Sequence, residues 1–144
     1  MKNICILLVI FITVLSCKKK ETPQPTPEEL IVGKWSIFSI TRSDITTPAC
    51  ELDNRYEFKQ GGVFVDNQGS NKCFLFFPSD NLGLWNMSDD YRKLTITYSD
   101  INDLPEVYDI LELTANQMTI QTDTIGGFPY RPNIQRNIIL KKVQ

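Results

Sequence analysis

Apolar and polar residues alternate along most of this chain. From Gly33 onward, apolar residues recur at every second position. This is the period of a β-strand with one buried face, and it differs from the 3.6-residue period of a helix. The predicted strands, eight or nine in number, cover residues 35–40, 56–59, 63–65, 73–77, 82–87, 94–98, 107–113, 118–121 and 134–142.

Three local features refine this pattern. The alternation slips between Ile37 and Phe38, which indicates a β-bulge or a strand buried on both faces. The segment Gln60-Gly61-Gly62 separates two alternating runs and predicts a tight hairpin. Residues 27–31 (Pro-Glu-Glu-Leu-Ile) favour a short helical turn, because proline is well tolerated in the first turn of a helix.

Consecutive hairpins without crossover helices predict an all-β fold, an antiparallel up-and-down meander. Closing the meander into a barrel removes its two edge strands. An open sandwich stays an alternative. We expect one domain over residues 29–144, which is long enough for a single core.

The N-terminal residues follow a different pattern. Lys2 precedes an apolar run of twelve residues, 4–15, whereas a membrane-spanning helix needs about twenty. A small residue, Ser16, and then Cys17 follow the run, and this order resembles the signal peptide and lipobox of a bacterial lipoprotein. The resemblance implies that residues 1–16 are removed and that Cys17 carries a lipid. A buried core helix and an uncleaved anchor are the alternatives.

Residues 17–28 are predicted to tether the lipid to the folded domain. Three lysines, residues 18–20, are followed by proline alternating with polar residues, a composition that favours extended conformations. Each lysine near anionic headgroups would add roughly 1 kcal/mol of attraction, unless the segment is an ordinary charged linker. By resemblance to lipoprotein sorting rules, Lys18 gives no inner-membrane retention signal, which implies the outer membrane, facing the periplasm.

Composition excludes several functions. The formal net charge is −2, and loss of Lys2 with the leader makes it one unit more negative, so nucleic-acid binding is not expected. Histidine is absent, which removes the commonest general base and metal ligand and excludes a serine triad. The pair Asp89-Asp90 is typical of a solvated turn. We predict no catalytic residue, cofactor or metal site.

Two cysteines remain once Cys17 is lipidated. Cys50 and Cys73 form an even pair in an oxidising compartment, which favours a disulfide. Closing that loop would stabilise the fold by roughly 3 kcal/mol. Two reduced buried thiols are the alternative, and two thiols alone do not complete a tetrahedral metal shell.

Three segments resemble a known family. Residues 33–35 (Gly-Lys-Trp) resemble the Gly-x-Trp of lipocalins. Residues 56–64 resemble the second and third strands of short lipocalin-like domains in Bacteroidetes lipoproteins. Residues 83–97 are similar to the Gly-x-Trp, turn and Lys-x-Leu-Thr-Ile element of those domains. The resemblance covers residues 30–142 and implies a small calycin-type barrel, shorter than a typical lipocalin.

The resemblance also implies how one barrel end is closed. In lipocalins the first tryptophan closes that end, and an arginine of the last strand packs on it. In this chain, Gly33 and Trp35 correspond to the motif that closes the barrel end. Arg136 corresponds to the arginine that packs on the tryptophan, and Arg131 is another candidate for that arginine. Such a cation–π contact contributes about 1 kcal/mol.

An eight-stranded barrel has an interior filled by side chains or holding one small ligand. The aromatic residues expected inside, as core or as the lining of an apolar pocket at the open mouth, are Phe58, Trp85, Tyr98 and Tyr108. The loop 123–133 places Phe128 and Tyr130 on a Gly/Pro-rich segment, which is typical of contact surfaces, or of a long loop that packs its own rings.

The sequence therefore predicts a membrane-anchored, non-catalytic barrel that binds a small apolar or amphipathic ligand. The alternative is a protein-interaction module of the envelope, an inhibitor or accessory subunit that uses loops such as 123–133.

Overall fold

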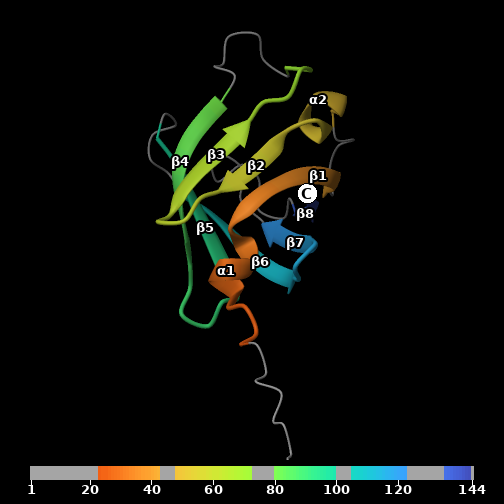
Figure 1. Ribbon diagram of the computed structural model, residues 1–144. Coiled ribbons are helices and arrows are strands. Elements are labelled where there is room, and N and C mark those ends of the chain that lie inside the picture. The colour runs from red at the N-terminus through yellow and green to blue at the C-terminus, as the bar shows by residue number, and fades with distance from the viewer. Residues whose placement is uncertain (1–22, 43–47, 73–79, 100–104, 123–134, 144) are drawn as a thin grey trace, which may run out of the picture.

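The computed structural model describes five segments of the chain, residues 23–42, 48–72, 80–99, 105–122 and 135–143. In these segments, eight antiparallel strands follow one another in chain order and close into a barrel (Figure 1). The strands are β1 (Gly33–Arg42), β2 (Arg55–Phe58), β3 (Val63–Asn67), β4 (Asp80–Met87), β5 (Lys93–Tyr98), β6 (Pro105–Leu113), β7 (Gln117–Thr122) and β8 (Arg136–Lys142). The predicted up-and-down barrel is confirmed, and closure excludes the open sandwich.

The predicted strands that fall on described residues match the observed ones to within two residues at each end. Residues 73–77, predicted as a strand, lie outside the described residues. The four-residue helix α2 (Ala49–Leu52) was not predicted, because a segment of this length shows no helical period. The other helix, α1 (Pro27–Ile31), coincides with the predicted helical turn.

The predicted bulge lies in β1. Ile37 pairs with Leu140 and Ser39 pairs with Ile139, so Phe38 has no cross-strand partner. The Phe38 side chain is 61% exposed, and the Lys141 Nζ lies 3.7 Å from its ring centroid. The bulge thereby lets β1 bury residues on both sides of Phe38 without a break in the barrel.

The β2–β3 hairpin turns at two glycines. Gly61 and Gly62 have φ angles of 86° and 85°, which a residue with a Cβ adopts at a cost. The Gly62 carbonyl accepts a hydrogen bond of 2.7 Å from the Trp85 backbone N–H. The predicted tight hairpin is confirmed, and this bond holds the turn against β4.

Helix α1 covers one end of the barrel (Figure 1). Thr26 caps it in a capping box with Glu29, which satisfies backbone N–H groups that the first turn leaves unpaired. Its last residue, Ile31, is fully buried, and the Ile31 carbonyl accepts a 2.7 Å hydrogen bond from the Trp35 indole N–H. Trp35 therefore does close this end, together with α1.

The predicted contact between Arg136 and Trp35 is wrong. The Lys142 Nζ lies 5.0 Å from the Trp35 ring centroid and donates a 2.7 Å hydrogen bond to the Leu30 carbonyl. Because β8 runs antiparallel to β1, Trp35 pairs with Lys142 at one end, and Arg136 pairs with Arg42 at the other. The other candidate, Arg131, lies outside the described residues.

Gly33 makes room for this arrangement. Its φ angle is +134°, and a Cβ at this position would lie 2.8 Å from the Lys142 Cε. A side chain here would displace the lysine stem from Trp35. Burial lowers the pKa of Lys142 below its usual value.

Aromatic rings fill the middle of the barrel. Phe58 contacts Trp85 edge-to-face at 5.7 Å between centroids, and it packs against Phe64 at 5.1 Å. Phe64 meets Tyr98 at 5.7 Å. The four predicted inward aromatics are all buried in this core, Phe58, Trp85, Tyr98 and Tyr108. These rings therefore occupy the centre of the barrel.

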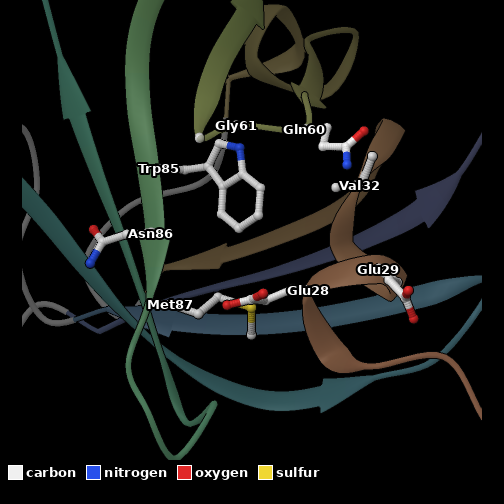
Figure 2. A pocket seen from close by; sticks show the side chains of 9 residues that line it. Glu28, Glu29, Val32, Gln60, Gly61, Trp85, Asn86 and Met87 are labelled. Atoms are coloured by element: carbon white, nitrogen blue, oxygen red, sulfur yellow. The ribbon is translucent and has the colours of Figure 1, made fainter.

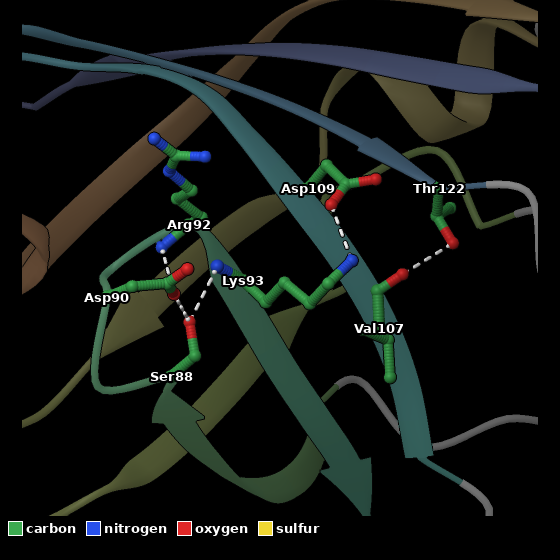
Figure 3. Close-up of polar contacts among 7 residues, drawn as sticks. All are labelled: Ser88, Asp90, Arg92, Lys93, Val107, Asp109 and Thr122. Carbon is green, nitrogen blue, oxygen red and sulfur yellow. Dashed lines mark hydrogen bonds and ion pairs between the residues drawn. The ribbon is translucent and has the colours of Figure 1, made fainter.

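Hydrogen bonds among its own residues hold the β4–β5 turn (Figure 3). The Ser88 hydroxyl donates to the Asp90 Oδ1 at 2.6 Å and accepts from the Lys93 backbone N–H at 3.0 Å. The hydrogen bond from Ser88 is the main cause that lowers the pKa of Asp90. Across the neighbouring strands, Lys93 forms an ion pair of 2.7 Å with Asp109.

Several predictions stay untested at the N-terminus and the cysteines. Residues 1–22, with the predicted leader and Cys17, lie outside the described residues. Among the helices of the described segments, none is long and apolar enough to cross a membrane. Cys50, in α2, is disulfide-bonded, but Cys73 lies outside the described residues, so this pairing stays a prediction.

Candidate functional site

The two barrel ends differ in chemistry. The end opposite α1, called the mouth below, is formed by the last residues of the odd-numbered strands and the first residues of the even-numbered strands. Helix α2 lies at this end (Figure 1). A cavity of about 180 Å³ opens there, lined by Arg42, Glu51, Asn54, Tyr56, Asp66, Gln68, Tyr98, Glu106 and Arg136.

Two arginines and one glutamate form the first part of the mouth. Arg42 and Arg136 are cross-strand partners on β1 and β8, and both reach the carboxylate of Glu51 on α2. The Arg42 Nη1 lies 3.1 Å from Oε1, and the Arg136 Nη2 lies 3.2 Å from Oε2. These three side chains are 11–19% exposed, so water screens the ion pairs weakly.

Asp66 forms the second part. It extends from β3 into the barrel and is 6% exposed. Burial is the main cause that raises its pKa to about 7, with Glu106 acting in the same direction and Arg136 opposing it. Among the described residues, no hydrogen-bond partner reaches the Asp66 Oδ1, nor the Oδ1 of Asn54 beside it. Buried oxygens of this kind are normally hydrogen-bonded.

Tyrosines and Glu106 complete the lining. The Tyr108 hydroxyl donates a short hydrogen bond to the Glu106 Oε2. Burial is the main cause that raises the pKa values of Tyr56, Tyr98 and Tyr108 above the usual value of a tyrosine. These phenols therefore stay neutral and can both donate and accept hydrogen bonds.

The mouth is polar, which corrects the prediction of an apolar pocket there. Of the predicted ligand-binding aromatics, Tyr98 lines the mouth cavity. Phe58 and Tyr108 are fully buried core residues, and Phe128 and Tyr130 lie outside the described residues. The physical reason is that the inward positions nearest the strand ends carry charged and amide side chains.

Charge complementarity limits what fits the mouth. With all its acids ionised, the lining holds two guanidinium groups against three carboxylates, Glu51, Asp66 and Glu106. One negative charge is therefore in excess. The arrangement can accept hydrogen bonds from a small positively charged group, and it lacks the apolar walls that a hydrocarbon tail needs.

A larger groove lies at the α1 end. It encloses about 520 Å³ between α1, the β2–β3 turn and the end of β4. Its lining residues are Glu28, Glu29, Val32, Gln60, Gly61, Gly62, Trp85, Asn86 and Met87. Figure 2 shows the six-membered ring of Trp85 directed into this space, so Trp85 is the predicted ligand-binding aromatic that lines the larger cavity. We call it the α1 groove.

Comparison with known proteins places the chain in a family. Residues 31–120 match the family model of the lipocalin-like domain. The chain belongs to the lipocalin-like domain family. Members of this family are generally non-catalytic binding proteins, and a barrel of this kind is consistent with binding a small ligand. No curated protein sequence matches the chain.

A solved lipocalin-like structure has the same fold. The crystal structure of a lipocalin-like protein from Bacteroides uniformis superposes with a TM-score of 0.52 at 15% sequence identity. The match covers 79% of this chain and 99% of that chain. At this identity the likeness describes the fold alone.

The acidic residues of the mouth were not predicted from the sequence. Asp66 lies on the same inward side of β3 as Phe64, and Glu106 lies on the same inward side of β6 as Tyr108. A polar residue that continues an inward-facing row is the signal that could have identified them. Arg136 was predicted as a site residue, but at the wrong end of the barrel.

Proposed function

We propose that this lipocalin-like protein is a lipid-anchored binding protein of the bacterial cell envelope. It takes up a small amphipathic ligand through the mouth of the barrel. The ligand presents an amine head to Asp66, and its apolar part extends out of the cavity. The protein performs no catalysis.

The observation that carries this proposal is the unpartnered Oδ1 of Asp66 in the mouth cavity. The two arginines nearby form ion pairs with Glu51, and among the described residues neither forms one with Asp66. An ammonium group at this position would donate a hydrogen bond and supply the missing positive charge. A cavity of about 180 Å³ holds such a head group and leaves the remainder of the ligand outside.

The support for the lipid anchor comes from the sequence. The order of lysine, apolar run, serine and Cys17 supports lipidation of Cys17, and residues 17–28 then tether the barrel to the membrane. We place the protein at the outer membrane, facing the periplasm.

A second candidate function is protein interaction. Val63, Leu82 and Leu84 form an apolar trio on the outside of β3 and β4, with exposures of 40%, 57% and 62%. Val63 and Leu84 are cross-strand partners, so the trio is continuous. Such a surface favours a protein partner, as the alternative prediction requires. The loop 123–133 lies outside the described residues.

Native mass spectrometry of the protein purified from its host tests the ligand proposal. We expect a bound small molecule that carries an amine, and we expect the Asp66→Asn variant to retain much less of it. A second protein in place of a small molecule would favour the interaction module. A chain without any adduct, in wild type and variant alike, would contradict the ligand proposal.

A further inference from the structure

The α1 groove is built from segments far apart in the sequence. Val32 follows α1, Gly61 lies in the β2–β3 turn, and Met87 ends β4. The groove lies at the end of the barrel opposite the mouth, next to the point where residues 23–26 join α1 (Figure 1). It is therefore separate from the ligand site proposed above, and it does not rest on that proposal.

Trp85 forms a fixed wall of the groove. Its indole N–H donates a 3.0 Å hydrogen bond to the Lys59 carbonyl, and its ring packs edge-to-face on Phe58. The ring edge that faces Met87 and Val32 is directed into the groove (Figure 2). Because the ring is already held, a ligand that packs on it loses little side-chain freedom.

The α1 groove carries negative charge. The charged residues in its lining are Glu28 and Glu29, both exposed. The Glu29 carboxylate accepts a 2.8 Å hydrogen bond from the Thr26 backbone N–H and so is committed to the helix cap. Among the described residues, none forms a hydrogen bond or ion pair with the Glu28 carboxylate.

We propose that the α1 groove binds a small amphipathic cation. Its apolar body lies against Trp85, Val32 and Met87, and its positive group lies beside Glu28. The volume of about 520 Å³ falls within the range of small-molecule sites, roughly 300–1,000 Å³. A cation is favoured over an anion because the lining carries two carboxylates and, within the described residues, no basic side chain.

Methionine methyl groups report on this site. Met87 lines the groove, whereas Met118 is fully buried in the core. The protein is labelled with ¹³C at its methionine methyl groups and titrated with octyltrimethylammonium, octanol and octanoate below their aggregation concentrations. These probes share one apolar body and differ in charge. We expect the ammonium to shift the Met87 signal at the lowest concentration and the octanoate at the highest, with Met118 unchanged.

Three variants complete the test. Glu28→Gln should weaken binding of the ammonium roughly threefold, as for an exposed ion pair, and leave octanol binding unchanged. Asp89→Asn removes an exposed turn carboxylate outside the groove and should have no effect. Asp66→Asn should also have no effect, so failure at the mouth and failure at the groove are distinguishable. Equal binding of the three probes, no shift of Met87, or unchanged ammonium affinity in Glu28→Gln would overturn the proposal.

Discussion

At the scale of single residues, Asp66 links the stability of the barrel to its binding site. The folded protein holds the Asp66 carboxyl group with a pKa of about 7, against a usual value of 3.8. Between these two values the folded state binds more protons than the unfolded state. The contribution of Asp66 to stability is therefore present below pH 3.8 and is lost as the pH rises to about 7.

We predict that Asp66→Asn stabilises the protein at pH 8 and removes most of this pH dependence. In the wild type, the part of the free energy of unfolding that depends on Asp66 should fall by on the order of 3 kcal/mol between pH 5 and pH 8. Urea unfolding at the two pH values measures it. Asp90→Asn, in an exposed turn where the pKa is lowered, is the control. An equal pH dependence of the free energy of unfolding in Asp66→Asn and wild type would contradict this role of Asp66.

Lys142 is the other residue whose role differs from expectation. We predict that Lys142→Ala lowers the free energy of unfolding by about 1 kcal/mol, because the hydrogen bond to the Leu30 carbonyl is lost. The indole N–H signal of Trp35 should shift as well. In Arg136→Ala that signal should stay in place, since Arg136 lies at the other end of β8. A shift caused by Arg136→Ala alone would restore the original prediction.

The sequence could predict which residues face inward but not what they contact. The alternation of apolar and polar residues correctly predicted that Phe58 and Tyr108 face inward, because successive residues of a strand point to opposite faces. The partner of Trp35 depends on the register between β1 and β8, which are the first and last strands of the barrel and lie far apart in the sequence. No local pattern contains that register, so Arg136 was chosen in place of Lys142.

At the scale of elements, helix α2 is held by what it contacts. Four residues do not form a stable helix by themselves. Glu51 joins α2 to both Arg42 and Arg136, and Cys50 adds a disulfide. The same helix forms part of the wall of the mouth, so its attachment shapes the site.

We predict that Glu51→Gln destabilises the protein by about 3 kcal/mol, because two buried guanidinium groups lose their counter-charge. Glu57→Gln is the matched control, since Glu57 forms an exposed pair with Lys59 at 4.0 Å and should change stability by less than about 1 kcal/mol. Chemical unfolding of both variants checks this. A similar small effect in both would show that α2 is not held by these ion pairs.

The elements differ in how well the sequence reveals them. Helix α1 has proline and a capping box at its start, and the β2–β3 hairpin has two glycines with positive φ. These signals are local, and both elements were predicted. Helix α2 has no such signal, because its stability comes from β1 and β8.

At the scale of the whole molecule, the order of hairpins predicted the antiparallel meander, and the pairing of β8 with β1 decides for the closed barrel over the open sandwich. Each strand pairs with the next in the chain, and β8 pairs back to β1. The chemistry of the interior was less predictable, because it depends on which inward positions lie at the mouth. Helix α1 closes the end of the barrel opposite the mouth.

We predict that Cys17→Ser moves the protein from the membrane fraction to the soluble fraction, because the lipid is attached at that thiol. Immunoblotting of the fractionated cells measures this. Cys5→Ser, a change within the predicted leader, is the control and should leave the protein on the membrane. Retention of Cys17→Ser in the membrane fraction would contradict the anchor.

Calorimetric titration of the protein with butylammonium at pH 8 and at pH 5 tests the central claim most directly. If the ligand head binds the ionised Asp66 carboxylate, the affinity should fall roughly 100-fold at pH 5, where only about 1% of that group is ionised. Asp66→Asn should bind weakly at both pH values. Equal affinity at the two pH values, or wild-type affinity in Asp66→Asn, would contradict a ligand site at the mouth of this barrel.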